Sequence, residues 1–126
     1  MKHKKYDNFK TKSVSSSLVR FAIDFKPEFV SDEVKQIAQL SLFDWFVVSL
    51  AGQTEPVSNI IRGQIKSDGG AEDCTVIGTT QRFPARASAL ANGTISHALD
   101  YDDTHFAYLG HPSVAIIPAA IAIGEK

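Results

Sequence analysis

The stretch Ser31-Asp-Glu-Val-Lys-Gln-Ile-Ala-Gln-Leu-Ser-Leu-Phe-Asp-Trp-Phe-Val-Val-Ser-Leu-Ala-Gly52 decides the fold class of this chain. Ser31 is a good N-cap, the two acidic residues that follow suit the positive end of a helix dipole, and Gly52 is a typical stop. The segment predicts a helix of about twenty residues. From Leu40 to Ala51 it is apolar on nearly every side, so we expect it to be buried on every side. Asp44 within it then needs a polar partner, because an unpaired buried charge is costly.

The segments on either side of this helix also predict helices, so the expected fold class is mainly α. Residues 1–14 are polar and contain several lysines, and we expect them to form a disordered tail. The further predicted helices cover residues 15–25, 57–67, 84–99 and 112–123. The helix that Pro84 starts is rich in alanine and other small residues, which would let neighbouring helices approach closely.

The region around Cys74–Gly78 is the one candidate for β-structure. Its β-branched residues, bounded by turn formers, predict at most a short strand or an extended link. The last predicted helix has no polar face, and Pro118 should kink it or mark its first turn. Two helices that need burial on all sides are more than this chain can easily cover. We therefore expect residues 15–126 to be an incomplete helical domain or part of an obligate oligomer.

The composition excludes several classes of function. The chain has 126 residues, 44% hydrophobic and 21% charged, with a net charge of −1, which is typical of a soluble globular protein and favours neither nucleic acid nor membrane. Cys74 is the only cysteine, so no internal disulfide can form. Residues 1–17 lack the apolar core of a signal peptide. We expect a cytoplasmic protein, or one of an organelle matrix if the source is eukaryotic.

The segment from His97 to His111 holds most of the groups that can carry out acid–base chemistry. It contains three of the four histidines, together with Asp100, Asp102, Asp103, Tyr101 and Thr104. Histidine titrates near neutral pH, so a cluster of this kind suits proton transfer. Cys74 is a weak candidate nucleophile, because no cationic neighbour would stabilise its thiolate.

His111 falls at the N-cap of the last helix, just before Pro112. The free amides of a first turn bind anions, so a substrate carboxylate is expected against the backbone of Ser113 and Val114. The same positive end disfavours imidazolium, which leaves His111 able to accept a proton. On the other side of the loop, helical spacing would line up four polar residues if the turn continued: His97, Asp100, Tyr101 and Thr104. The two histidine-bearing ends would then face one pocket.

Simpler interpretations of the same residues stay open. Asp102-Asp103-Thr104 can be an ordinary turn in which Asp103 caps a helix, and His97 can be a hydrogen-bonded core histidine. Tyr101 and Tyr108 can be packing residues. A metal site is the sharper alternative, because histidine and aspartate ligands are plentiful here. The sequence contains neither a His-Glu-x-x-His motif nor an EF-hand loop, so we expect no metal.

Several motifs together resemble the MmgE/PrpD family, which includes 2-methylcitrate dehydratase, cis-aconitate decarboxylase and iminodisuccinate epimerase. They are Ala89-Leu-Ala-Asn-Gly93, His97-Ala-Leu-Asp-Tyr-Asp-Asp-Thr-His105, Gly110-His-Pro-Ser113 and Ile117-Pro-Ala119. Asp44 in a Leu-Phe-Asp-Trp helix, Ala51-Gly52 and Thr75-Val-Ile-Gly78 also fit. The resemblance covers residues 15–126.

The resemblance implies a helical domain paired with a smaller lid domain, usually in a dimer, that acts without metal or organic cofactor on small di- and tricarboxylates. Dehydration, decarboxylation and epimerisation in this family proceed by proton transfer next to a carboxylate. The catalytic positions implied are His111, Asp100 and Thr104, and the substrate-binding positions that we expect are Ser113, His105, Tyr101 and His97. The family's active-site lysines and its lid domain have no counterpart in these 126 residues. The alternative is therefore a non-catalytic, truncated or split piece that needs a partner chain.

Overall fold

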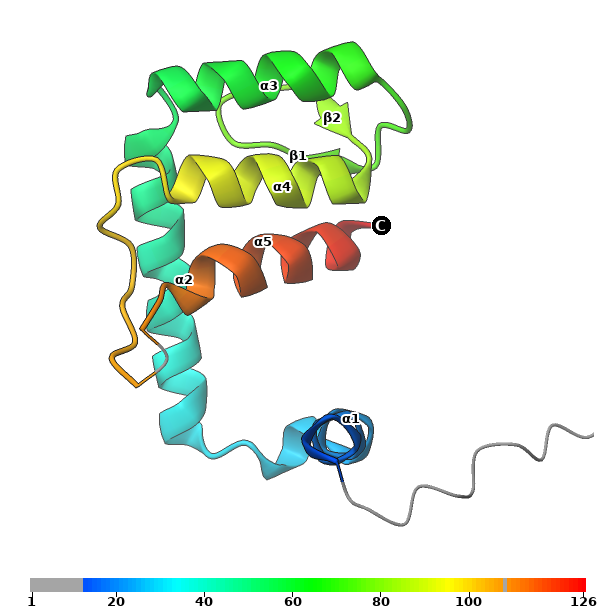
Figure 1. Cartoon of the computed structure of the whole chain (residues 1–126), viewed down its shortest axis with the longest axis vertical. Coiled ribbons are helices and arrows are strands. Elements are labelled where there is room, and N and C mark those ends of the chain that lie inside the picture. The colour runs from blue at the N-terminus through cyan, green and yellow to red at the C-terminus, as the bar shows by residue number, and fades with distance from the viewer. Residues whose placement is uncertain (1–12, 108) are drawn as a thin grey trace, which may run out of the picture. The chain divides into compact units, whose positions relative to one another are not determined.

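A computed structural model of the chain describes residues 13–107 and 109–126, which divide into two compact units between Lys35 and Gln36 (Figure 1). The smaller unit contains helix α1, Val14–Asp24, and the 3-10 helix η1, Pro27–Phe29. The hydroxyl of Ser13 caps α1 by accepting a hydrogen bond from the Ser16 amide at 3.1 Å. Helix α1 thus includes Val14, which we had assigned to the tail. The rest of that predicted tail, up to residue 12, lies outside the described residues.

The other elements of the described residues are four helices and one small antiparallel sheet. They are α2, Asp32–Gly52; α3, Pro56–Asp68; β1, Cys74–Thr75; β2, Arg82–Phe83; α4, Ala85–Ser96; and α5, Pro112–Glu125. The mainly α fold class is confirmed. The short strand expected at 74–78 is present as β1, and it pairs with β2, which the sequence analysis did not predict.

The helix ends follow the capping residues with one exception. The Ser31 hydroxyl accepts from the Val34 amide at 3.3 Å, and proline is the first residue of both α3 and α5. Helix α4 instead ends at Ser96, short of the predicted Leu99, with His97 as its C-cap. The chain leaves the helix here through a turn in which Asp100 has a φ of 54°, a left-handed conformation that cannot continue a right-handed helix.

Helix α4 packs between α3 and α5 and forms the centre of the larger unit, residues 36–126 (Figure 1). The buried hydrophobic cluster combines α3, the strand segment and α4: Ile65, Val76, Phe83, Ala91 and Ile95. Gly93 of α4 lies so close to α5 that a Cβ there would be 3.1 Å from the carbonyl oxygen of Val114. The predicted role of small residues in close helix packing is therefore confirmed at Gly93.

Polar side chains fasten the short β-segment to the helices. The side-chain amide of Asn92 accepts a hydrogen bond from the Ile77 N–H at 2.9 Å through Oδ1. Its Nδ2 donates to the Thr75 carbonyl at 3.0 Å. At the end of α5, the Glu125 carboxylate accepts from the amide and hydroxyl of Thr75, at 2.7 and 2.6 Å, and these bonds lower the pKa of Glu125. Burial raises the pKa of Cys74, so its thiol is a poor nucleophile, as expected.

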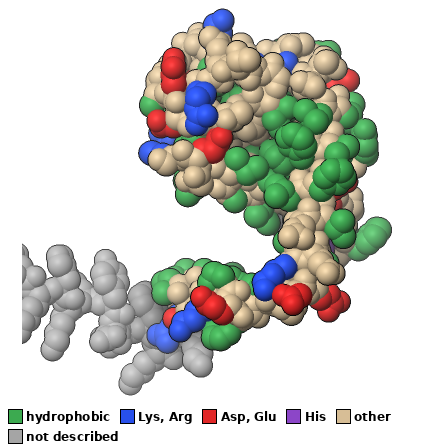
Figure 2. Space-filling view, turned by 180° about the vertical axis from the view of Figure 1, so that it is seen from behind, with side chains coloured by type: hydrophobic (Ala, Val, Ile, Leu, Met, Phe, Trp, Pro, Cys, Tyr) green, Lys and Arg blue, Asp and Glu red, His purple; other side chains and the backbone are tan. Residues whose placement is uncertain are grey.

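We expected helix α2 to be buried on every side, but only one side of it is buried. Its buried residues are Trp45, Val48, Ser49 and Gly52, a single helical stripe. Asp44 is exposed and therefore needs no buried partner. Phe43 on α2 is 68% exposed and Ile116 on α5 is 64% exposed, because the described residues cover only part of each helix. Figure 2 shows hydrophobic side chains gathered on one face of the larger unit. No helix in residues 13–107 and 109–126 combines the length and apolarity that a membrane crossing needs.

Gly52 joins α2 to the end of α4, and its replacement tests this contact. A Cβ at Gly52 would clash with the carbonyl oxygen of Ile95 and would lie 3.3 Å from Cβ of Ala98. We expect Gly52→Ala to lower the free energy of unfolding in urea by about 1–3 kcal/mol, as overpacking does. Gly63→Ala is the control, because a Cβ at this helical glycine meets nothing within 4 Å. It should raise the free energy by up to about 1 kcal/mol. Equal effects of the two changes would contradict the assigned contact.

Candidate active site

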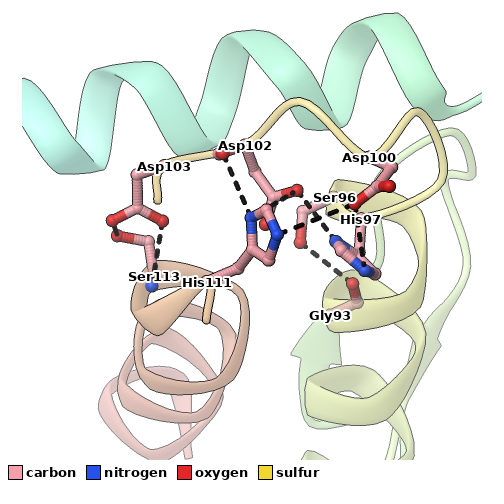
Figure 3. Close-up of polar contacts among 8 residues, drawn as sticks. All are labelled: Gly93, Ser96, His97, Asp100, Asp102, Asp103, His111 and Ser113. Carbon is pink, nitrogen blue, oxygen red and sulfur yellow. Dashed lines mark hydrogen bonds and ion pairs between the residues drawn. The ribbon is translucent and has the colours of Figure 1, made fainter. Parts of the chain in front are cut away.

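Two histidines from different helices meet at one end of the larger unit (Figure 3). His97 caps the end of α4 and His111 is the N-cap of α5, as predicted for His111. Their ring centroids are 4.9 Å apart and the rings are tilted by 58°. The thirteen residues between them fold back because α4 and α5 pack side by side (Figure 1). The two histidine-bearing ends thus come together, although not through the continued helical turn on which the expectation rested, and a shared pocket stays a prediction.

Asp102 lies between the two histidines and holds both rings. Its side chain is 1% exposed, and its Oδ1 is 2.8 Å from His97 Nδ1 and 3.5 Å from His111 Nδ1. The backbone carbonyl of Asp102 is 3.2 Å from His111 Nδ1. A carboxylate and a carbonyl only accept hydrogen bonds, so each Nδ1 carries a proton that it donates to Asp102. In the neutral ring, each Nε2 then has a free lone pair.

Asp100 faces the opposite nitrogens of the same two rings. Its Oδ1 is 3.7 Å from Nε2 of His97 and 3.7 Å from Nε2 of His111. The Asp100 side chain is 77% exposed, so this side of the histidine pair is open to solvent. The left-handed backbone of Asp100 turns its carboxylate toward the histidines (Figure 3). Asp100 and His111, which the family resemblance implies as catalytic positions, therefore lie side by side, and their catalytic roles stay predictions.

Asp103 caps helix α5, which confirms the simpler interpretation of that residue. Its carboxylate accepts from the Ser113 amide at 3.1 Å and from the Ser113 hydroxyl at 2.6 Å. We had expected a substrate carboxylate against the backbone of Ser113. In the structure the Asp103 carboxylate uses both Ser113 donors, and the expected substrate contact stays a prediction.

The remaining predicted site residues lie on the exposed part of the loop. The helical spacing proposed for Tyr101 and Thr104 is wrong, because α4 has ended at Ser96. Both residues are exposed, so Tyr101 is not a packing residue among the described residues, and Tyr108 lies outside them. His105 is also exposed, and its backbone forms a bridge with Gly110 that closes the loop. Their proposed contacts with substrate stay predictions.

Asp100 was predicted as a site residue from the sequence, whereas Asp102 was not. Three aspartates in four positions carry no periodic signal in a loop, so nothing local distinguishes the buried one from its neighbours. With His97, Asp100 and His111, Asp102 forms a group whose ligand atoms lie within 4.8 Å of one another. Chemically, this group presents two imidazole nitrogens on its open side and a buried carboxylate behind them, which is an arrangement suited to accepting and donating protons.

Comparisons with known proteins give the family. The model of the MmgE/PrpD N-terminal domain matches residues 16–126. The cis-aconitate decarboxylase-like protein oryM of Aspergillus oryzae is 29% identical over 113 residues. This match covers 90% of the present chain but 23% of the relative, so the chain spans about a quarter of the relative's length. The paired histidines lie within the matched region, and the chain belongs to the MmgE/PrpD family.

Proposed function

We propose that this chain carries the histidine-bearing half of an active site that acts on a small di- or tricarboxylate by acid–base proton transfer. The observation that carries the proposal is the pair of Nε2 atoms, of His97 and His111, held on one open side by the Nδ1 bonds to Asp102. The reaction would be dehydration, decarboxylation or epimerisation. Each needs a group that removes or supplies a proton at a carbon next to a carboxylate.

The residues have separate proposed roles. His111 exchanges the proton with substrate, since its fixed Nδ1–H leaves Nε2 as the acceptor. His97, whose ring lies against the His111 ring, and Asp100, whose carboxylate is 3.7 Å from His111 Nε2, orient and tune His111. Thr104, exposed on the same loop, donates a hydrogen bond to a substrate carboxylate. No metal or organic cofactor takes part in the proposed reaction.

The charge of the site indicates what the rest of the protein must supply. The groups around the histidine pair are carboxylates, Asp100 and Asp102, which repel an anionic substrate. We propose that cationic side chains from outside this chain, in the remainder of the protein or in a partner subunit of a dimer, bind the substrate. Such cations also stabilise the enolate-like charge that forms when the proton leaves.

The test is turnover by the protein that carries this sequence at its full genetic length. It is incubated in D₂O with cis-aconitate, with 2-methylcitrate and with a panel of C4 dicarboxylates, and followed by NMR. We expect loss of one substrate, or deuterium at the carbon next to a carboxylate. If neither occurs with any compound, the proposal is wrong.

A non-catalytic, split piece is the second candidate, and the exposed apolar side chains of α2 and α5 favour it. The same assay separates the two by comparing the 126-residue chain alone with the chain mixed with a separately expressed remainder of a relative. Under this candidate the chain has no activity in either sample and only forms a complex. Turnover that appears on mixing supports the catalytic half-site.

A further inference from the structure

The open side of the histidine pair brings together three atoms that each hold a free electron pair. They are Nε2 of His97, Nε2 of His111 and Oδ1 of Asp100, since both Nδ1 protons are donated to Asp102. At 3.7 Å, neither Nε2 is within hydrogen-bond distance of Asp100 Oδ1. Three converging electron pairs repel one another unless a cation or a hydrogen-bond donor lies among them.

We propose that these three atoms form a binding site for a divalent transition-metal ion of the zinc class, which excludes substrate when it is occupied. Zinc binds imidazole nitrogen and carboxylate oxygen at about 2.0–2.2 Å, so tetrahedral ligand atoms are about 3.3–3.5 Å apart. The observed 3.7 Å separations need to shrink by only a few tenths of an ångström. Imidazole ligands favour zinc, copper or nickel over magnesium or calcium, which prefer oxygen.

Asp102 supplies the supporting contact that histidine metal ligands usually have. Histidines that bind metal through Nε2 commonly donate Nδ1–H to a carboxylate or a backbone carbonyl, which fixes the ring and raises its basicity. His97 donates to the Asp102 carboxylate and His111 to the Asp102 carbonyl. One residue, Asp102, thereby orients both proposed ligands, His97 through its side chain and His111 through its backbone carbonyl.

The charge of the group gives a second, independent reason for a cation. Asp102 Oδ2 is buried and has no hydrogen-bond partner among the described residues, so part of a buried negative charge is uncompensated. With neutral imidazoles, the two carboxylates leave two negative charges at one place. A divalent ion bound by the histidines and Asp100 cancels both, which offsets the cost of burying Asp102.

Metal binding is argued from the geometry and the charge of this group, whereas its effect on turnover rests on the proposed function. The Nε2 lone pair of His111 that would accept a substrate proton is the same lone pair that binds the metal. A bound ion therefore removes the base and fills the space before Asp100, and we expect it to inhibit the enzyme rather than to activate it.

The experiment is a titration of the chelator-treated protein with Zn²⁺ by calorimetry and with Co²⁺ by visible absorption. We expect one saturable equivalent, with a Co²⁺ spectrum that shows nitrogen and oxygen ligands. His111→Ala should weaken binding roughly tenfold or more. Asp100→Asn is the milder variant, because asparagine tolerates the left-handed backbone and Asp100 is exposed, so the fold is kept. It should also weaken binding.

His105→Ala is the matched control, a histidine of the same loop outside the metal-ligand group, and should leave the Zn²⁺ affinity unchanged. Absence of saturable binding, or binding that His111→Ala and Asp100→Asn leave unchanged, overturns the site. Turnover without metal binding would overturn the metal site and leave the proposed function standing. If metal binds at these residues and turnover does not change, the proposal that metal and substrate compete for one site is wrong.

Discussion

Replacement of His111 by alanine is expected to lower kcat about 100- to 10,000-fold, the usual contribution of a general acid or base. The reason is that His111 Nε2 is the accepting nitrogen on the open side of the site, while Nδ1 is bound to the Asp102 carbonyl. The fold should survive, because the His111 side chain makes no capping hydrogen bond to α5, and Asp103 caps that helix through Ser113.

The His111 prediction is checked by measuring kcat and KM separately on the substrate that the NMR assay identifies. A loss in kcat with little change in KM indicates a role in proton transfer rather than in binding. His111→Gln keeps a polar side chain of similar length but cannot exchange a proton, so it should be as inactive as the alanine variant. Added imidazole should restore part of the activity of His111→Ala. Wild-type kcat in either variant, with circular dichroism unchanged, would exclude His111 as the acid–base group.

The helical part of the fold was predictable because its signals are local. Ser31 before two acidic residues, and proline at the first position of α3 and α5, fix helix starts by side-chain chemistry that needs no distant partner. The N-cap position of His111 was predictable by the same rule, because Pro112 follows it. The position of Gly93 against α5 also has a local signal, the run of small residues in α4.

The features that sequence reasoning missed depend on distant partners. Strand β2 is two residues long and exists because it pairs with β1. Helix α4 ends at Ser96, ahead of the left-handed backbone of Asp100, and no periodicity indicates either feature. The same holds for burial: α2 has an apolar sequence on nearly all sides, yet one stripe alone is covered. What covers a helix is a property of its neighbours and not of its own residues.

The candidate site divides in the same way. The dense histidine and aspartate segment was sufficient to predict a candidate site in this loop and to suggest that its two histidine-bearing ends face each other. It was not sufficient to assign the three aspartates, which differ only in tertiary contacts. Asp100 is exposed and faces both Nε2 atoms. Asp102 is buried on the Nδ1 side of both rings, and Asp103 caps α5. No role for Asp102 could be predicted from the sequence alone.

Asp102→Asn is expected to reduce kcat about 100- to 10,000-fold without loss of the fold, although Asp102 need not touch substrate. Asparagine has the same size, so the buried space stays filled. Its amide, however, can donate as well as accept. If it donates to His97 Nδ1, the ring proton moves to Nε2, and the open side of the site then presents an N–H of His97 where it had presented a lone pair. Loss of the buried charge also leaves less compensation for a protonated His97 or His111.

A merely structural role of Asp102 would change stability but not the histidine tautomers, so the decisive readout is ¹⁵N NMR of the imidazole nitrogens. We expect the wild type to show Nδ1–H for both rings and Asp102→Asn to show a changed tautomer at His97, together with the fall in kcat. Asp103→Asn is the matched control, since the neighbouring aspartate contacts Ser113 and neither histidine. It should keep both the tautomers and kcat. A normal kcat in Asp102→Asn with a changed tautomer would mean that the His97 ring takes no part in catalysis. Unchanged tautomers with a lost kcat would instead assign to Asp102 an effect through charge alone, because the hydrogen bonds that hold the two rings would then be intact.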